Sequence, residues 1–261
     1  MGEIRIGTSG YSFPDWVGHY YPRGTKSRDM LPIYARDFDA VEINSTYYRP
    51  PTEKTMAGMV ERTPAGFSFF VKAHQDFTHK GDLTGREAFL AALAPMREAG
   101  RLSGLLFQFP QSFKNTEAGR RHLAAIAKGF PETVAVEFRD DSWASEPVYR
   151  YLESLGLSLV AVDEPETSTL FPRVARATGA VGYLRFHSRD AGRWYAGGAE
   201  RYNYRYSDAE LGQWLPGLRE MAARVGSIYV FFNNCFRAQA VDNARRMKEL
   251  IGTVDLWGRE L

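Results

Sequence analysis

Charged and amide side chains recur at the ends of the chain's short apolar segments. Glu137 and Arg139 end VAVEFR, while Lys72 and His74 end FFVKAH. Two carboxylates such as those of Glu137 and Asp163 can share general acid–base work once their surroundings separate their pKa values. The amine of Lys72 is suited to act as a base, or as a nucleophile that forms a Schiff base with a carbonyl compound. These residue types favour an enzyme, with Glu137, Asp163 and Lys72 as the expected catalytic groups.

Further polar residues at these segment ends are suited to hold a substrate. The planar guanidinium groups of Arg139 and Arg185 match the oxygen atoms of a carboxylate or phosphate, and the amides of Asn233 and Asn234 can orient a ligand. We therefore expect a small anionic or polyhydroxylated substrate, such as a sugar phosphate or a nucleotide-like molecule. The expected substrate-binding residues are Glu42, Asn44, His74, Gln108, Arg139, Trp143, Arg185, His187, Tyr195, Asn233 and Asn234.

The same charges could instead pair with one another as a purely structural network. The charged residues concerned are Glu42, Glu137, Asp163, Lys72, Arg139 and Arg185. Buried ion pairs add little net stability because each ion loses its hydration. If the ends of the apolar segments served stability alone, we would expect apolar residues there. We therefore favour a ligand pocket, although for Lys72 by itself we favour a role as the charge partner of Glu42 or Glu137.

The segment 188–206, SRDAGRWYAGGAERYNYRY, combines four arginines and five Tyr or Trp residues with only two carboxylates. Such a segment could close as a lid over a phosphate, a sugar or a stacked base. It could also bind single-stranded nucleic acid by stacking and by phosphate contacts, which is the alternative function to an enzyme. A third interpretation is a surface flap packed by cation–π contacts.

Metal ligands are sparse in this sequence. Of the five histidines, only His74 and His187 fall at segment ends, and no His-Glu-x-x-His pattern occurs. We expect no cofactor and no zinc site; a divalent metal held by the carboxylates of Glu42, Glu137 or Asp163 is the alternative. The lone cysteine, Cys235, excludes an internal disulfide and is expected to be a buried bystander.

Eight apolar segments, most of them followed by a helical pattern, must position these residues. The expected strands cover 4–7, 40–43, 67–72, 105–109, 134–138, 159–162, 182–187 and 228–232. The expected helices cover 86–99, 116–128, 147–155, 207–225 and 239–251. This order predicts an α/β fold, a closed (β/α)₈ TIM barrel formed as a single domain by residues 1–261. A doubly wound open sheet is the alternative, but the first strand lacks the Gly-x-Gly-x-x-Gly turn common in that fold.

The strand ends would bring the polar side chains to one end of such a barrel. Active sites of this fold lie at the C-terminal ends of the strands. Because side chains alternate across a strand, Glu137 and Arg139 are expected to share the inner face of the fifth strand. On the sixth strand the same alternation is expected to place Ala161 and Asp163 inward.

Composition excludes several classes of protein. Hydrophobic residues make up 44% and charged residues 25% of the chain, which is typical of globular proteins. The formal net charge of +2 is too small to indicate a nucleic-acid or membrane partner by itself. The start MGEIRIGTSG lacks the pattern of a signal peptide. We expect a cytoplasmic protein with a small-molecule ligand and no membrane association.

Several motifs resemble the YecE-like family, also called domain of unknown function 72. They include VEINSTYYRPP, FSFFVKAHQDFTH, LLFQFP, VEFRDDSW, LRFHSR and YVFFNN. The resemblance implies a (β/α)₈ barrel with a polar groove at its C-terminal face, and it implies no particular reaction. The family motifs fall on Glu42, Asn44, Lys72, His79, Gln108, Glu137, Arg139, Trp143, Asp163, Arg185, His187, Asn233 and Asn234. Ser188 stands where the family commonly has glycine. The sequence does not distinguish between hydrolase, isomerase and lyase chemistry.

Overall fold

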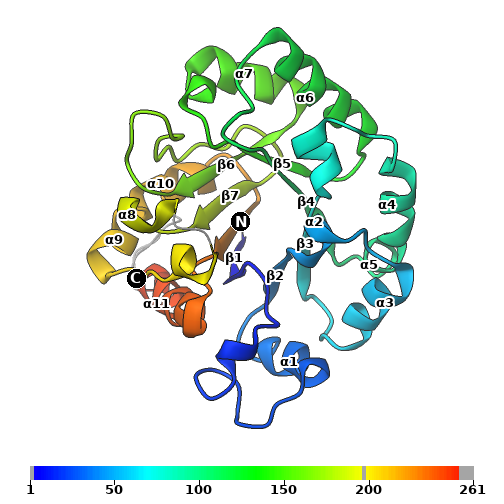
Figure 1. Cartoon of the computed structure of the whole chain (residues 1–261), viewed down its shortest axis with the longest axis vertical. Coiled ribbons are helices and arrows are strands. Elements are labelled where there is room, and N and C mark those ends of the chain that lie inside the picture. The colour runs from blue at the N-terminus through cyan, green and yellow to red at the C-terminus, as the bar shows by residue number, and fades with distance from the viewer. Residues whose placement is uncertain (1–2, 196–197, 253–261) are drawn as a thin grey trace.

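Eight parallel β-strands curve into a barrel, and the helices lie outside it (Figure 1). The computed structural model describes residues 3–195 and 198–252. The strands are β1 (Glu3–Thr8), β2 (Ala40–Ile43), β3 (Ser68–Lys72), β4 (Leu102–Gln108), β5 (Val134–Glu137), β6 (Ser158–Asp163), β7 (Gly182–Phe186) and β8 (Ser227–Phe232). They follow the order β1-β8-β7-β6-β5-β4-β3-β2. The predicted single-domain (β/α)₈ barrel is confirmed.

Helices follow most strands and shield the outer faces of the sheet. They include α1 (Ser27–Tyr34), α2 (Ser45–Tyr48), α3 (Glu53–Glu61), α4 (Arg86–Ala92), α5 (Ala94–Glu98), α6 (Glu117–Gly129), α7 (Glu146–Leu155), α8 (Ala191–Trp194), α9 (Asp208–Gly212), α10 (Leu215–Ala222) and α11 (Gln239–Gly252). Between β6 and β7, residues 164–181 contain no helix. No helix in the described ranges is both long and apolar enough to cross a membrane.

Two helices predicted as continuous are each split in the structure. The predicted helix 86–99 divides into α4 and α5, and the predicted helix 207–225 divides into α9 and α10. Pro95 lies in the first turn of α5 and Pro216 in the first turn of α10. Proline lacks the backbone N–H that a helix interior requires, so each splits an otherwise regular apolar pattern. The capping box of Ser207 and Glu210 starts α9 as the sequence indicates.

The barrel closes between β1 and β2 through a side chain rather than through a full backbone ladder. The backbone N–H of Thr8 donates to the hydroxyl of Tyr34 at 2.8 Å, and that hydroxyl donates to the carbonyl of Ala40 at 3.1 Å. One bridge between Ser9 and Glu42 completes the seam. A Cβ atom on Gly7 would lie 2.0 Å from the Ala40 carbonyl oxygen, so the approach of the two strands requires glycine.

Aromatic rings fill the lower part of the barrel. The rings of Phe70, Tyr183, Tyr229 and Phe231 contact one another with centroids 4.7 to 6.4 Å apart. Edge-to-face and tilted arrangements of this kind are the favoured geometries for aromatic pairs. The layer separates the polar side chains at the C-terminal strand ends from the opposite end of the barrel.

Replacing Gly7 by alanine should destabilise the barrel. The added methyl group meets backbone of β2, which cannot rotate away as a side chain can, so we expect a loss of about 1–3 kcal/mol in the free energy of unfolding. Gly212→Ala is the matched control, because a Cβ there meets nothing within 4 Å, and it should change stability by less than about 1 kcal/mol. Urea denaturation measures both, and equal stabilities of the two variants would contradict the prediction.

Candidate functional site

The strand register determines which polar residues face the barrel interior. Parallel partners on neighbouring strands share a face. Glu137 pairs with Gln108, Lys72 with Leu106, and Arg185 with Phe231 of the interior aromatic layer. The predicted residues that the structure brings together inside or directly above the barrel are Glu42, Lys72, Gln108, Glu137, Arg139, Arg185, His187 and Asn233.

Asp163 is not one of them. It pairs with Phe186, and both side chains face the outer helices rather than the interior. Its carboxylate accepts hydrogen bonds from Arg189 at 2.6 Å, from the indole of Trp214 at 2.6 Å and from the hydroxyl of Tyr206 at 3.0 Å. The predicted inward face of β6 is therefore wrong, and Glu137 and Asp163 form no carboxylate pair.

Glu164, which the sequence interpretation missed, takes the inward position on this strand. Its Oε2 lies 2.5 Å from the guanidinium of Arg139, and its side chain is fully buried. Burial is the largest influence on Glu164 and raises its pKa to about 7, with the nearby charge of Glu137 adding to the effect. Apolar residues occupy both faces of LVAV, so alternation by itself could not show which of Asp163 and Glu164 faces inward.

A buried ion-pair layer lies directly above the aromatic layer. Arg185 donates to Glu42 at 2.7 Å and to Glu137 at 2.5 Å, so it joins β2 and β5 across the barrel. The second oxygen of Glu42 accepts from Tyr183 at 2.6 Å, and the second oxygen of Glu137 lies 2.5 Å from Arg139. Burial opposes ionisation of Glu137, but Arg139 and Arg185 outweigh it and hold its pKa well below the usual range.

Arg139 extends this network toward the C-terminal end of the barrel. Besides Glu137 and Glu164, it lies 3.2 Å from Nε2 of His187 and 5.1 Å from the ring centre of Trp194. Burial and the neighbouring charge of Arg139 hold the pKa of His187 well below its ordinary value, which favours a neutral imidazole. The amide nitrogen of Asn233 lies 3.0 Å from the other ring nitrogen of His187.

Lys72 contacts an amide and an aromatic ring rather than its predicted charge partner, Glu42 or Glu137. Its amine donates to the amide oxygen of Gln108 at 2.9 Å and lies 4.3 Å from the ring centre of Tyr47. Among the described residues no carboxylate lies within 4.0 Å of it, since Glu42 and Glu137 are engaged by Arg185. Burial, followed by the charge of Arg185, lowers the pKa of Lys72 to about 7.

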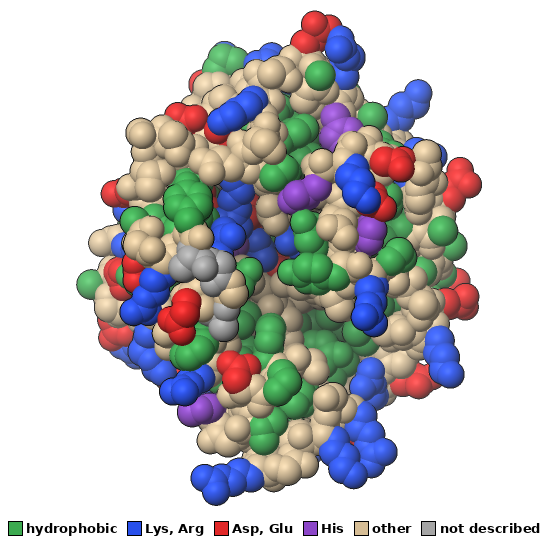
Figure 2. Space-filling view, viewed as in Figure 1, with side chains coloured by type: hydrophobic (Ala, Val, Ile, Leu, Met, Phe, Trp, Pro, Cys, Tyr) green, Lys and Arg blue, Asp and Glu red, His purple; other side chains and the backbone are tan. Residues whose placement is uncertain are grey.

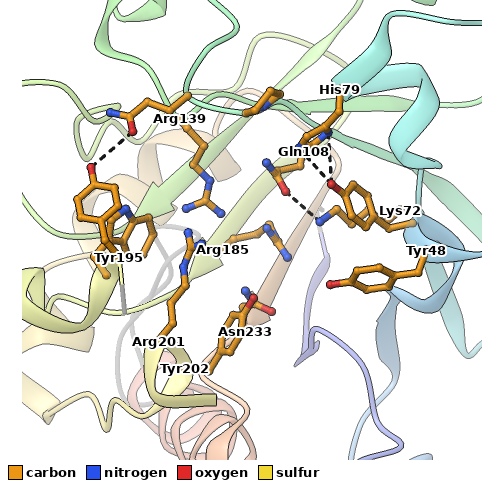
Figure 3. A pocket seen from close by; sticks show the side chains of 14 residues that line it. Tyr48, Lys72, His79, Gln108, Arg139, Arg185, Tyr195, Arg201, Tyr202 and Asn233 are labelled. Carbon is orange, nitrogen blue, oxygen red and sulfur yellow. Dashed lines mark hydrogen bonds between the residues drawn. The ribbon is translucent and has the colours of Figure 1, made fainter. Parts of the chain in front are cut away.

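These residues border a cavity of about 350 Å³ at the C-terminal ends of the strands. The described lining residues are Tyr47, Tyr48, Lys72, His79, Gln108, Pro110, Gln111, Arg139, Arg185, Trp194, Tyr195, Arg201, Tyr202 and Asn233. Four are cations and none is a carboxylate. Figure 2 shows Lys and Arg side chains inside the hollow at the centre of this face. In Figure 3 the guanidinium ends of Arg139 and Arg201 face each other, and that of Arg185 lies between them and Lys72.

Two predicted binding residues lie beside this cavity rather than in it. Asn44 lines a separate pocket of about 260 Å³ whose walls are mostly apolar. His74 faces Asp76, with 3.2 Å between its Nδ1 and the carboxylate. Both follow strands with inward-facing ends, but the chain turns into α2 and into the short π-helix Asp76–Lys80 at these points. His79, which is on that π-helix, lines the cavity instead.

Two further predicted residues are structural. Trp143 is fully buried, stacks on Phe138 with ring centres 4.5 Å apart, and donates its indole N–H to the carbonyl of Phe113. Asn234 is fully buried and donates to the carbonyl of Tyr204. Neither reaches the cavity wall. Tyr195, in contrast, lines the cavity as predicted and is 68% exposed.

The segment 188–206 contributes Trp194, Tyr195, Arg201 and Tyr202 to the cavity lining. The Arg201 guanidinium lies 4.3 Å from the ring centre of Trp194, whose ring also contacts Arg139. Burial, and then the charge of Arg139, lowers the pKa of Arg201. The other arginines pair with carboxylates: Arg189 with Asp163, Arg193 with Asp190, and Arg205 with Asp242. The described part of the segment therefore forms one wall of the cavity.

No group of three or more His, Cys, Asp or Glu side chains in residues 3–195 and 198–252 is arranged to hold a metal ion. The carboxylates considered from the sequence do not converge. Glu42 and Glu137 share Arg185, whereas Asp163 binds Arg189 on the outer side of the sheet. Cys235 is buried, as expected, and burial raises the pKa of its thiol.

Replacing Arg185 by methionine should destabilise the protein strongly. Glu42 and Glu137 would each lose a buried partner, and removing one partner of a buried ion pair costs about 3–5 kcal/mol. Arg121→Met is the control, because the exposed pair of Arg121 with Glu117 should contribute less than about 1 kcal/mol. Chemical denaturation distinguishes the two, and a loss below 1 kcal/mol for Arg185→Met would refute the buried-layer assignment.

The stability of the protein should rise between about pH 7 and 10.5 through Lys72. The folded state releases the Lys72 proton near pH 7, whereas the unfolded chain keeps it up to about 10.5. The unfolded state therefore binds more protons in this window, so alkaline pH favours folding. Subtracting the urea-denaturation pH profile of Lys72→Met from that of the unsubstituted protein isolates this rise. A flat difference across the window would contradict the lowered pKa.

Comparisons with known proteins agree with the barrel fold. A family model described as "Protein of unknown function DUF72" matches residues 5–258. The chain is similar to the UPF0759 protein YunF of Bacillus subtilis (strain 168), with 31% identity over 269 residues, 95% of this chain and 94% of that protein. A crystal structure of a DUF72 family protein from Thermotoga maritima aligns with a TM-score of 0.89 and 37% identity, covering 96% of this chain and 99% of that one. One from Enterococcus faecalis aligns with a TM-score of 0.83 and 26% identity, covering 99% of each. The chain belongs to the DUF72 family of proteins of unknown function.

Proposed function

We propose that this chain is an enzyme that acts on a small anionic, polyhydroxylated substrate in the cavity at the C-terminal strand ends. A sugar phosphate is the representative of this class. The observation that carries the proposal is the charge of the cavity wall: Lys72, Arg139, Arg185 and Arg201 line it, and no described lining residue is acidic. Guanidinium groups bind phosphate and carboxylate through paired hydrogen bonds.

The ion-pair layer neutralises Arg139 and Arg185, which leaves Lys72 and Arg201 as the lining cations without a described carboxylate partner to favour an anion. Glu42 and Glu137 lie beneath the cavity, where Arg185 and Arg139 engage them. Arg201 has no carboxylate among its described hydrogen-bond and ion-pair partners and lies against Trp194. A ligand phosphate would neutralise charge at the site where desolvation makes such contacts strong.

The aromatic side chains suit the remainder of such a substrate. Tyr47, Tyr48, Tyr195 and Tyr202 line the cavity, and so do the amide side chains of Gln108, Gln111 and Asn233. Aromatic faces pack against the C–H faces of sugar rings or against bases, while amides bind hydroxyl groups. The cavity therefore combines an anion-binding wall with a wall suited to hydroxyl-bearing groups.

Lys72 is the acid–base group that this geometry favours. Glu137 stays ionised and bound to two arginines, so it has no free proton to transfer near neutral pH. The amine of Lys72 borders the cavity and changes its charge at about pH 7, where a general base or acid is most effective. Glu137 then acts by fixing Arg139 and Arg185, the groups that would hold the anion.

Binding of ribose 5-phosphate tests the anionic substrate class. It should raise the melting temperature of the protein, whereas ribose should not. Arg201→Ala should weaken binding of ribose 5-phosphate about tenfold or more, because a hydrogen bond to a charged group contributes about 1.5–3 kcal/mol.

Arg205→Ala is the matched control, because Arg205 pairs with Asp242 and does not line the cavity. Calorimetric titration should find its affinity unchanged. Equal affinities for ribose and ribose 5-phosphate, or equal losses in the two arginine variants, would contradict an anion site at this cavity.

A further inference from the structure

We propose that Lys72 is a nucleophile that forms a Schiff base with a carbonyl substrate carrying a phosphate or carboxylate group. This inference rests on the proposed function and deepens it: it names the reactive group of the substrate, and it gives the uncharged Lys72 amine the role of nucleophile in place of general acid–base group. It stands on the placement of the Lys72 amine in the cavity, on the neutral partners that surround it, and on the arginines on the opposite wall.

Gln108 holds the amine without neutralising it. The amide nitrogen of Gln108 donates to the carbonyl of Phe109 at 2.7 Å, which turns its oxygen toward the Lys72 amine at 2.9 Å. A glutamate in this place would pair with the ammonium and keep it protonated. The amide accepts one hydrogen from the amine and leaves the nitrogen lone pair free once the lysine is deprotonated.

Burial and a neighbouring cation favour the neutral amine. The charge of Arg185 opposes a second cation, and together with burial it outweighs the carboxylates of Glu137 and Glu42, which favour the ammonium form. The Tyr47 ring lies 4.3 Å from the amine. A lysine that is desolvated and placed beside another cation is activated for attack on carbonyl groups. About half of Lys72 is thereby uncharged near pH 7.

The reaction balances without a redox partner. The lone pair of the amine attacks the carbonyl carbon, a C–N bond forms as the carbon–oxygen π bond breaks, and one N–H proton is transferred to the oxygen to give a carbinolamine. Loss of the hydroxyl group together with the second N–H proton, as water, then leaves the imine. The hydroxyl of Tyr47 lies 3.1 Å from Nε2 of His79, and both side chains line the same wall as Lys72. This pair is placed to give and take the protons that the two steps require.

The opposite wall defines the rest of the substrate. Arg139, directly after β5, and Arg201, in the segment 188–206, face the cavity, while Lys72 enters from β3 (Figure 3). A substrate whose anionic group binds the arginines would therefore direct another part of the molecule toward the amine. Phosphorylated ketones and aldehydes, and 2-oxo acids, share this arrangement of an anion and a carbonyl group.

Reductive trapping tests the proposal directly. The protein is incubated at pH 7 with dihydroxyacetone phosphate and cyanoborohydride, and the modified lysines are identified by peptide mass spectrometry. Lys72 should be modified at least about tenfold faster than exposed Lys54 and Lys128 in the same sample, because burial and the charge of Arg185 lower the pKa of its amine to about 7. sn-Glycerol 3-phosphate, which has the anion without the carbonyl, should protect Lys72.

Two variants separate the nucleophile from the anion site. Gln108→Glu preserves shape but supplies a carboxylate, so Lys72 modification should fall to the rate of Lys54 while sn-glycerol 3-phosphate still binds. Arg201→Ala should slow trapping by dihydroxyacetone phosphate but not by formaldehyde, which has no anion. Far-ultraviolet circular dichroism verifies that both variants are folded.

The outcomes distinguish this inference from the proposed function. If sn-glycerol 3-phosphate binds but Lys72 is modified no faster than Lys54, the Schiff base is refuted and the anion site stands. If formaldehyde labels Lys72 but dihydroxyacetone phosphate and pyruvate do not, the anionic carbonyl class is refuted. If sn-glycerol 3-phosphate, dihydroxyacetone phosphate and ribose 5-phosphate all fail to bind, the proposed function itself fails.

Discussion

Arg185 spans the interior of the barrel and holds one carboxylate on each side. A guanidinium this deeply buried requires hydrogen-bonding partners of opposite charge, and Glu42 on β2 with Glu137 on β5 supply them. The partners impose further conditions in turn. Glu42 has a second oxygen that accepts a hydrogen bond from Tyr183, and Glu137 has one that forms an ion pair with Arg139. The arrangement above the aromatic layer follows from neutralising this one cation.

The same constraint sets the charge of the cavity. Because the layer engages the inward carboxylates of β2 and β5, the wall above it presents Lys72 and three arginines without an acidic neighbour in the described lining. One cause thus has two effects: the surplus positive charge favours an anionic ligand, and it also favours release of the Lys72 proton. Binding and reactivity would both depend on Glu137 staying paired with Arg139 and Arg185 beneath the cavity.

Most of the barrel could be predicted from the sequence because strand ends and alternation are local patterns. Glu42, Lys72, Gln108 and Glu137 follow strands in which polar residues mark the inner face at the end of the strand. The inward face of the sixth strand was predicted wrongly because LVAV is apolar on both faces. Its pairing with β7 is what reveals that Glu164 faces inward. Trp143 was predicted to bind substrate, because an aromatic residue after a strand gives the same sequence pattern whether it stacks on a ligand or, as here, on Phe138. The cavity-lining Tyr47, Tyr48 and Gln111 lie beyond the strands, where alternation carries no information.

The Tyr34 hydroxyl that joins β1 to β2 has a consequence for motion. In a ring of eight strands, one interrupted ladder is enough to turn the barrel into an open sheet with two free edges. The seam between Thr8 and Ala40 relies on a side chain and one bridge, whereas neighbouring strands share longer ladders, so partial opening costs least there. Glu42 sits at this seam. Each opening would let water reach the ion-pair layer from its edge. The rate of hydrogen exchange at the backbone amides beside Glu42 would measure how often the seam opens.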